Sequence, residues 1–459
     1  MKFRYRNEDE MKDSDIEWIG KIPKHWNSIM FKRVIQRVSN GIWGDDAKSN
    51  SDDIPCIRVL NFNRNTMEVK IDNLTIRNIP RIKQKGYLLK KGDLLIEKSG
   101  GGEKSPVGFV VRYNYELPAV YANFMAKISL NNNTISEYIK YLCSAIYNRK
   151  LHLDSINQTT GIQNLDSEIY FKRYIALPNV LEQEKIAKFL DEKTAEFDSI
   201  ISKKEALIEK LEEAKKSLIS EVVTGKVKVV KTSDGYELVQ RKKEEMKNSG
   251  VEWLGEIPKE WKTTKLKLKT VQVNRGKSPE YVEESKIKVI NQACIYWDCF
   301  NLKNVKYQNE INLGERGKLY KNDILINSTG TGTLGRANIF KEDGNFIADS
   351  HVTIIRCKDK SFADYLKYVF RTDLYQGLIY STIVTGSTNQ IELSREGLRN
   401  MIVLDISNEE LNLINNILED KINKINLVID KTKSEIEKLK EAKQSLISEA
   451  VTGKIEILE

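Results

Sequence analysis

The sequence contains little of the chemistry that enzymes and metal proteins use. It has five cysteines, an odd number without a Cys-x-x-Cys pair, and three widely spaced histidines, His25, His152 and His351. Such a cysteine set predicts neither a disulfide framework nor a structural zinc, so we expect reduced, mostly buried thiols. The histidines complete neither a metal-binding His-Glu-x-x-His motif nor a catalytic triad. The sequence therefore gives no sign of a catalytic residue or a metal site.

Signatures of nucleotide, cofactor and membrane binding are missing as well. Gly276-Lys277-Ser278 resembles the end of a phosphate-binding loop, but Val271 stands where that loop needs its first glycine. No Gly-x-Gly-x-x-Gly opens a dinucleotide-binding unit, and the Asn-Pro-Pro-aromatic motif of amino-methyltransferases does not occur. No run of about 18 apolar residues is present, and the N-terminus lacks a signal-peptide pattern. We expect a cytoplasmic, non-catalytic protein that holds no cofactor and binds no membrane.

Two stretches of the chain occur twice. Residues 17–26, Glu-Trp-Ile-Gly-Lys-Ile-Pro-Lys-His-Trp, return as residues 252–261, Glu-Trp-Leu-Gly-Glu-Ile-Pro-Lys-Glu-Trp. Residues 213–227 return as residues 441–455, and both copies contain Ser-Leu-Ile-Ser-Glu-x-Val-Thr-Gly-Lys. Two halves of nearly equal length thus share their opening and closing segments and differ in between. Because the two halves share their ends and differ in between, the simplest interpretation is a protein with two recognition sites, each of which recognises something different.

The length and the charge distribution agree with this division. At 459 residues the chain is too long for one core, since single cores stop growing near 250 to 300 residues. We divide it into segments 1–180, 181–225, 226–405 (with 226–248 as a linker) and 406–459, whose net charges are +8, −3, +7 and −3. The positive excess lies in the two variable segments, as expected if they face DNA phosphates. An ordinary solvated basic surface would have the same composition.

The shared closing segments belong to two predicted long helices. Asn179-x-x-Glu182 and Ser407-x-x-Glu410 have the form of capping boxes, and Gly225 and Gly453 stand where each helix should end. Between these signals apolar residues recur every three or four positions for more than four heptads, which is typical of a coiled coil. The first helix has Ile186, Leu190, Phe197, Ile200, Ile201, Leu207, Leu211, Ala214, Leu218 and Val222, and the second has Ile414, Leu418, Ile422, Ile425, Ile429, Ile436, Leu439, Ala442, Leu446 and Ala450.

Two equal helices in one chain pack most economically as an antiparallel pair with a pseudo-twofold axis. Such a pair would place the two variable segments at opposite ends and set their separation. A bundle that holds two domains together without measuring a distance fits the periodicity equally well.

The variable segments contain short strand-like runs separated by glycine, which predicts two mixed α+β domains. The runs are 54–60, 94–96, 107–113, 126–130 and 174–177 in the first half, and 288–290, 324–326, 337–340, 351–356 and 401–404 in the second. One helix-like stretch lies in each half, at 136–150 and 362–376.

A few loops align between the halves and carry polar side chains. Residues 92–101 match 322–331, residues 159–165 match 384–391, and Arg58 and Asn61 align with Val289 and Asn291. Glycines let the backbone approach phosphates, and Ser, Thr, Asn, Gln, Lys and Arg bond to phosphates and base edges. The candidate DNA-binding residues are Arg58, Asn61, Lys98, Ser99, Lys104, Gln158, Thr159, Thr160, Gln163, Asn164, Arg275, Lys277, Ser278, Asn291, Gln292, Thr329, Thr331, Thr333, Arg336, His351, Thr385, Ser387, Thr388, Asn389 and Gln390. A role in making turns fits any single one of them equally well.

With these features the chain resembles the specificity subunit of type I restriction-modification enzymes over its whole length. The residues that carry the resemblance are Ile175-Ala-Leu-Pro178-x-x-Leu-Glu-Gln-Glu184-x-Ile186 and the twice-used Leu-Ile-Ser-Glu-x-Val-Thr-Gly-Lys closing segment. The second half departs from the family pattern, because residues 402–410 contain neither the proline nor the glutamine. This departure leaves the start of the second helix less sharply defined.

The resemblance implies two target-recognition domains, residues 1–180 and 226–405, that read the two halves of a split DNA target. It implies that two methylation subunits bind along the helices and methylate adenine N6 in each half-site. Restriction subunits, where present, would cleave unmodified double-stranded DNA after ATP-driven translocation. S-adenosylmethionine, ATP and Mg²⁺ would be used by these partners. Because the two domains differ in their loops, we expect an asymmetric bipartite target.

Two other functions remain open at this point. A stand-alone sequence-specific DNA-binding regulator would bind its site tightly without methylation subunits. A scaffold that binds no DNA would show no salt-dependent affinity for random duplex.

Overall fold

The computed structural model describes residues 1–458 except 160, 234, 311–314, 331 and 386–390. Its contacts divide the chain into two compact units. Unit 1 comprises residues 1–205 and 432–459, and unit 2 comprises residues 206–431. Each unit combines one variable segment with one part of each long helix.

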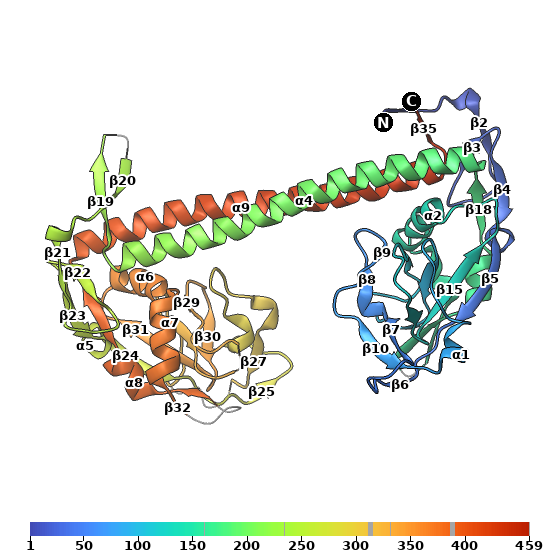
Figure 1. The fold of residues 1–459 in the computed structure, drawn as a ribbon. Helices are drawn as coiled ribbons and strands as arrows, with labels where there is room; N and C mark the ends of the chain where they lie inside the picture. Colours follow the sequence, from blue (N-terminus) through green and yellow to red (C-terminus); the bar gives the residue numbers. More distant parts are fainter. Residues whose placement is uncertain (160, 234, 311–314, 331, 386–390, 459) are drawn as a thin grey trace. The chain divides into compact units, whose positions relative to one another are not determined.

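The variable segment of unit 1 is built around two sheets (Figure 1). The larger sheet has the order β5 (Ile35–Asn40), β15 (Met125–Leu130), β11 (Leu94–Glu97), β13 (Val110–Arg112), β9 (Glu68–Val69) and β8 (Phe62–Asn63). The smaller has the order β14 (Val120–Tyr121), β7 (Asp53–Ile57), β10 (Thr75–Asn78) and β6 (Asp45–Asp46). Helix α2 (Ser136–Asn148) packs on this core and buries nine of its residues.

Unit 2 repeats this frame with shorter sheets. One sheet has the order β24 (Thr270–Arg275), β31 (Val352–Cys357), β28 (Ile324–Asn327) and β29 (Ala337–Ile339). The other has the order β25 (Tyr281–Val282), β27 (Lys306–Gln308), β26 (Ile287–Ile290) and β30 (Asn345–Ala348). Helix α6 (Lys360–Val369) takes the place of α2. Among the described residues, β29 has no outer neighbours like β9 and β8.

Shorter elements complete both units. In unit 1 they are β2 (Met11–Asp13), β3 (Lys21–Pro23), β4 (Asn27–Met30), α1 (Arg81–Gln84), β12 (Ser99–Gly100), β16 (Ile156–Thr159), β17 (Ile162–Leu165), α3 (Ser167–Lys172) and β18 (Tyr174–Leu177). In unit 2 they are β21 (Met246–Asn248), β22 (Glu256–Pro258), β23 (Lys262–Lys265), α5 (Leu266–Lys269), α7 (Asp373–Leu378), β32 (Val384–Thr385), β33 (Glu392–Leu393), α8 (Arg395–Asn400) and β34 (Ile402–Asp405). The predicted mixed α+β class is confirmed.

The two predicted long helices are present as α4 (Val180–Val223) and α9 (Asn408–Val451), each of 44 residues. The side chains of Asn179 and Ser407 accept hydrogen bonds from the amides of Glu182 and Glu410, at 3.0 and 3.2 Å, as the capping boxes predict. Both glutamates depart from the capping-box pattern. The carboxylate of Glu182 accepts a hydrogen bond from Arg6, and that of Glu410 accepts one from Arg241. Both helices end before a left-handed glycine, as predicted.

The parts of α4 and α9 in each unit pack side by side through equivalent residues. In unit 1 the Nζ of Lys443 lies 2.7 Å from Oδ1 of Asp198, and in unit 2 the Nζ of Lys215 lies 3.0 Å from Oδ1 of Asn426. Lys215 and Lys443 hold the same position in the repeated closing segments, and so do Asp198 and Asn426 in the two helices. The same contact is therefore made twice, as a pseudo-twofold repeat requires.

The predicted apolar seam is wrong at Ile200, Leu207 and Ala214 of the first helix and at Ala442 of the second, because these side chains are exposed. Ala214 and Ala442 are exposed, and their neighbours Lys215 and Lys443 are buried. A lysine is buried when its ammonium group finds acceptors. Besides Asp198, Lys443 donates to the main-chain oxygen of Asn65, at 3.0 Å. Heptad spacing alone could not show that acceptors from another part of the chain meet these lysines.

The two repeated stretches pack against each other within each unit. Trp26 is fully buried in the core of unit 1, beside Pro23 and Gly453. A side chain at Gly453 would come within 2.4 Å of Cδ of Pro23, and one at Gly225 would come within 2.4 Å of Cγ of Pro258 in unit 2. Each opening segment thus packs on the closing segment of the other half.

The ends of the chain continue this pattern. Strand β1 (Phe3–Tyr5) pairs antiparallel with β35 (Ile455–Ile457) in unit 1. In unit 2 the corresponding strands are β19 (Val227–Thr232) and β20 (Gly235–Gln240), which form one hairpin. The segment predicted as a linker, 226–248, therefore contains the hairpin and β21.

One predicted helix is divided in the structure. The stretch 362–376 forms α6 and α7, because Thr372 accepts a hydrogen bond from the amide of Tyr375 and caps a new helix. The predicted strands are present with shifted ends, and His351 lies in the turn that precedes β31.

The cysteines agree with the expectation of free, mostly buried thiols. All five are free, and Cys56, Cys143 and Cys294 are buried, whereas Cys299 is exposed. Among the described residues no group of His, Cys, Asp or Glu side chains could hold a metal ion. The described helices include none long and apolar enough to cross a membrane.

Candidate nucleic-acid interface

A small three-stranded sheet in unit 1 brings together candidate residues that are about sixty positions apart in the sequence. Its order is β12-β17-β16, and Ser99 pairs with Asn164 in its register. The hydroxyl of Ser99 donates to the side-chain oxygen of Asn164. The Nζ of Lys98, immediately before β12, donates to Oδ1 of Asn40 at 3.0 Å. Strand pairing thus gathers polar and basic groups from the two predicted loops of the first half.

Not all the candidates on this sheet face outward. Gln158 and Asn164 are exposed, whereas Gln163 is buried and its Oε1 accepts from the amide of Val107 at 3.3 Å. Gln163 therefore holds the glycine-rich loop in place. Lys104 in that loop is exposed and has no hydrogen bond or ion pair with another described residue.

The segment after β7 holds two further candidates. Arg58 is exposed, its Nη1 donates to Oγ1 of Thr75 at 3.2 Å, and its guanidinium carbon lies 5.7 Å from the ring centre of Trp43. Asn61 is buried and accepts from the amide of Arg58 at 2.9 Å. Arg58 is therefore presented to solvent, and Asn61 closes the turn beneath it.

In unit 2 three candidates form a hydrogen-bonded chain, although each comes from a different segment. Nε2 of Gln292 donates to Oγ1 of Thr329, which lies 2.9 Å from Nδ1 of His351. Either the hydroxyl of Thr329 or the imidazole can be the donor in the second contact. The other ring nitrogen of His351, Nε2, forms no hydrogen bond with a described residue and is available to a base or a phosphate.

Several candidates of unit 2 are engaged inside the domain. Arg275 forms an ion pair with Glu392, and burial lowers the pKa of its guanidinium. Asn291 accepts from the amide of Ala293 at 2.9 Å and donates to the main-chain oxygen of Asn304 at 2.9 Å. These side chains shape the loops before any ligand binds.

The turn between β28 and β29 contains Gly330, Gly332 and Gly335, a literal Gly-x-Gly-x-x-Gly. It leads into a strand, so it lacks the helix N-terminus that a pyrophosphate needs. The hydroxyl of Thr333 donates back to main-chain oxygens of this turn. Arg336 at its end is half-buried, and its guanidinium carbon lies 5.1 Å from the ring centre of Tyr296.

The remaining candidates lie in turns and at strand ends of the two units or outside the described residues. Lys277 pairs with Asp349 in an isolated bridge, Ser278 is exposed, and Thr385 is exposed at the end of β32. Thr159 ends β16, and its side chain is not described. Thr160, Thr331, Ser387, Thr388, Asn389 and Gln390 lie outside the described residues.

Equivalent backbone hydrogen bonds in the two units identify one further residue, Phe124, which the sequence did not predict. The amide of Ser328 donates to the oxygen of His351, and the amide of Lys98 donates to the oxygen of Phe124. Phe124 therefore holds in unit 1 the place of His351 in unit 2, and it is 56% exposed. An exposed phenylalanine looks like a core residue in the sequence, so no local signal marks it.

The same comparison corrects one internal alignment. Ile57 lies beside Tyr121 as Ile290 lies beside Ala348, at the ends of equivalent parallel strand pairs. Arg58 therefore corresponds to Asn291, and the predicted alignments of Arg58 with Val289 and of Asn61 with Asn291 are both wrong. At this position a cation in one half is replaced by an amide in the other.

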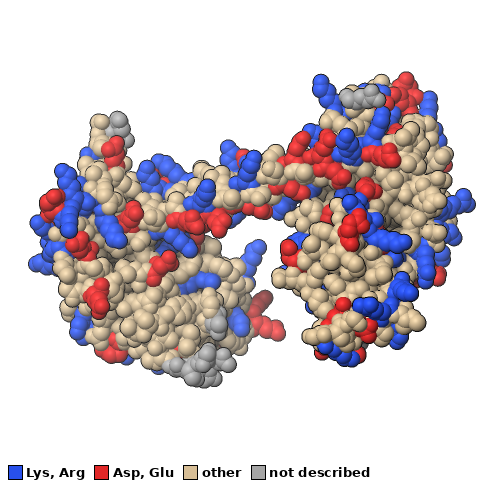
Figure 2. All heavy atoms as spheres, in the orientation of Figure 1, with Lys and Arg blue, Asp and Glu red and all other residues tan. Residues whose placement is uncertain are grey.

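Charge on the surface is mixed. Figure 2 shows Lys and Arg on the visible face of both units with Asp and Glu among them, and many acidic side chains along the helices. The buried His152 does not add to the candidates, because burial lowers its pKa to about 4 and keeps it neutral. The surface of the two units is therefore not uniformly basic, and a ligand would bind through specific loop residues.

Comparison with known proteins shows similarity to one family. Residues 23–211 match the family model described as "Type I restriction modification DNA specificity domain". The chain is 25% identical over 356 residues to the type I restriction enzyme MjaVIII specificity subunit of Methanocaldococcus jannaschii, covering 74% of this chain and 75% of that protein. It is 24% identical over 348 residues to the EcoBI specificity subunit of Escherichia coli, covering 73% and 66%.

A solved chain has the same fold. It comes from a study of complex assembly and conformational transition of the type I R-M system, and it superposes with a TM-score of 0.68 at 13% identity, covering 94% of this chain and 99% of its own. Together with the two halves and their repeated segments, these similarities agree with the resemblance drawn from the sequence. The chain is thus similar in sequence, over about three quarters of its length, to type I restriction enzyme specificity subunits, and it shares its fold with a chain of a type I R-M system.

Proposed function

We propose that each variable segment reads one half of an asymmetric bipartite sequence in double-stranded DNA. The observation that carries the proposal is the pair of equivalent sheet ends with unlike side chains. At corresponding positions unit 1 presents Ser99 and Phe124, and unit 2 presents Thr329 and His351, while the partly exposed Lys98 of unit 1 is replaced by the buried Ser328 in unit 2. Different donors and acceptors on one frame select different base edges.

Exposed and engaged candidates have different proposed roles. The exposed side chains of Arg58, Lys104, Gln158, Asn164 and His351 contact bases or phosphates. The engaged ones orient the loops, which lowers the entropy lost when DNA binds. Base contacts provide specificity, and phosphate contacts position the domain.

We further propose that the long helices bind two methylation subunits and set the distance between the half-sites. Both helices leave large apolar side chains exposed, which is typical of a surface that a partner covers. Leu181 is 72% and Ile200 is 44% exposed in unit 1, and Leu427 is 70% and Val428 is 46% exposed in unit 2.

The chemistry belongs to the partners in this proposal. Methylation subunits use S-adenosylmethionine to methylate adenine N6, and restriction subunits use ATP and Mg²⁺ to translocate and cleave DNA. The chain itself directs these reactions as a non-catalytic subunit and acts in the cytoplasm. None of the comparisons favours a stand-alone regulator.

Co-assembly tests this proposal. The chain is expressed with the methylation subunit of its own system, and complex formation is measured by light scattering and methyl transfer by tritium incorporation into DNA. We expect one chain to bind two methylation subunits, and methyl transfer to require both proteins. A chain that stays monodisperse alone, binds one DNA site tightly and ignores the methylation subunit would instead be a regulator.

A further inference from the structure

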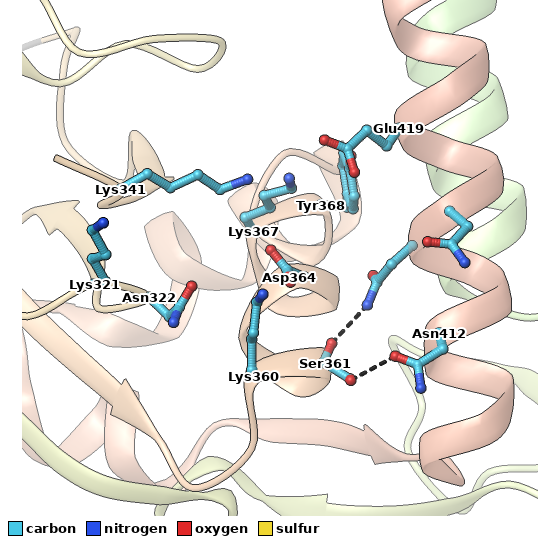
Figure 3. Close-up of a pocket in the computed structure, with 12 residues that line it drawn as sticks. Lys321, Asn322, Lys341, Lys360, Ser361, Asp364, Lys367, Tyr368, Asn412 and Glu419 are labelled. Carbon is cyan, nitrogen blue, oxygen red and sulfur yellow. Dashed lines mark hydrogen bonds between the residues drawn. The ribbon is translucent and has the colours of Figure 1, made fainter.

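Unit 2 contains a pocket where α6 meets α9, with a volume of about 530 Å³. Lys321 and Lys341 reach it from the turns before β28 and after β29, and Lys360 and Lys367 come from α6. Helix α9 contributes the other wall with Asn412, Asn415, Asn416 and Glu419. Figure 3 shows Lys341 extending from its turn toward the end of Lys367.

The positive charge of this pocket is not balanced by its neighbours. Lys341, Lys360 and Lys367 form no hydrogen bond or ion pair with another described residue, whereas Lys321 pairs with Asp343 at 2.7 Å. Two carboxylates, of Asp364 and Glu419, line the pocket beside the four lysines. Burial lowers the pKa of Lys367, and the ammonium group of Lys341 lowers it further. An anion in the pocket would relieve this repulsion.

Equivalent hydrogen bonds made by α2 and α6 identify the corresponding place in unit 1. The hydroxyl of Tyr138 in α2 donates to the main-chain oxygen of Val451, and that of Tyr365 in α6 donates to Val223. Val223 and Val451 hold the same position in the repeated closing segments. Two residues after each tyrosine stands a lysine, so Lys140 corresponds to Lys367.

In unit 1 a carboxylate from a neighbouring strand occupies this place. The Nζ of Lys140 lies 2.8 Å from Oε1 of Glu68 and 3.0 Å from Oδ1 of Asp191. Glu68 stands on β9, which pairs with β13, and Arg112 of β13 lies 3.5 Å from the same carboxylate oxygen. The lysine is thus neutralised from within the domain.

Unit 2 keeps this lysine as Lys367, but its described residues contain no counterpart of Glu68. Glu419 corresponds to Asp191, but no strand of the described residues lies beside β29 as β9 lies beside β13. Lys341 and Lys360 stand where unit 1 has Asn114 and Asn133. The site that is filled in one unit is therefore open and more basic in the other.

The position of the pocket separates it from the candidate DNA contacts. Strand β28 runs from the pocket, after Asn322, to the loop that holds Thr329, and β31 runs from His351 back toward Lys360. The pocket and the loops therefore lie at opposite ends of this sheet, separated by four- to six-residue strands, or roughly 13 to 20 Å. The pocket opens instead beside α9, where a protein partner is proposed to bind.

We propose that this pocket binds carboxylates of an acidic segment of the methylation subunit that docks on unit 2. The inference rests on the proposed function and deepens it. Glu68 shows that this place in the fold accepts a protein carboxylate, and the extra lysines of unit 2 favour a doubly acidic one. Because unit 1 supplies its own carboxylate, the two methylation subunits dock through different contacts.

The test reverses two exposed charges of the pocket. In Lys341→Glu/Lys360→Glu, we expect the affinity for one of the two methylation subunits to fall at least tenfold at physiological salt, while the other still binds. Native mass spectrometry during a titration measures both steps. The matched control, Lys90→Glu/Lys91→Glu, changes two exposed lysines at the corresponding corner of unit 1 and should bind both subunits normally. Lys341→Arg/Lys360→Arg should also bind both.

Carbodiimide cross-linking identifies the occupant directly. It joins an amine to a carboxylate in contact, so we expect amide links from Lys341, Lys360 or Lys367 to Asp or Glu of the methylation subunit. Unchanged affinity of the charge-reversed chain for both subunits would overturn the proposal. Intact subunit binding with weaker, less salt-dependent DNA binding would also overturn it and identify a phosphate. If the unaltered chain bound no methylation subunit, the proposed function itself would fail.

Discussion

Replacing residues 226–405 with the corresponding segment of another family member is expected to change one half of the methylated sequence and leave the other unchanged. The loops that differ between the halves lie within 1–180 and 226–405. Each mismatched base pair typically costs about 1–3 kcal/mol. A foreign half-site that differs at three positions would therefore lose binding by several orders of magnitude.

The exchange should preserve the fold, because the replaced segment meets the helices through repeated residues. Trp261 and Pro258 pack on the closing segment of the first half, as Trp26 and Pro23 pack on that of the second. Methylated positions are read by sequencing DNA from cells that contain the chimera and its methylation subunit. The control chimera exchanges residues 1–180 and should change the other half. A change in both halves from one exchange would contradict the domain assignment.

Truncating the buried tryptophan of either opening segment is expected to give the largest loss of stability from a single substitution. Trp26→Ala and Trp261→Ala each leave a large cavity between an opening segment and a closing segment, and such changes cost about 3–5 kcal/mol. Both side chains are at most 2% exposed. Hydrogen exchange, followed peptide by peptide, should show faster exchange in unit 1 for Trp26→Ala and in unit 2 for Trp261→Ala.

The conservative replacements separate packing from hydrogen bonding. Nε1 of Trp261 donates to the carboxylate of Glu410 at 2.7 Å, whereas Nε1 of Trp26 is buried without a partner among the described residues. Both Trp→Phe changes remove the same volume, but a hydrogen bond to a charged group contributes about 1.5–3 kcal/mol. Trp261→Phe should therefore destabilise its unit more than Trp26→Phe. Equal losses would mean that this hydrogen bond contributes nothing.

Much of the fold could be predicted because its signals are local or repeated. The caps at Asn179 and Ser407 and the glycines at 225 and 453 marked the ends of both helices within two residues. Short apolar runs marked the central strands, because buried strands need apolar side chains on both faces. The repeat itself implied that one frame is built twice.

Features that depend on distant contacts could not be predicted. The burial of Lys443 depends on Asp198 and on an oxygen of Asn65, which no sequence window contains together. The break after α6 depends on the cap of Thr372, a residue that also fits a helix interior.

The candidate site shows the same limit. Loop composition identified Lys98, Thr329 and His351, and the structure places each at the equivalent sheet end of its unit. Composition did not distinguish the buried Gln163 from the exposed Asn164 beside it, because strand pairing decides which side chain faces outward. It could not identify Phe124 for the same reason.

Sequencing N6-methyladenine in the DNA of cells that contain this chain and its methylation subunit tests the central claim most directly. Because the two variable segments carry different loops, we predict a modified sequence with two different specific parts. Each part should contain one methylated adenine, and the gap between them should have a constant length. A strict palindrome, or one uninterrupted recognition sequence, would contradict the account.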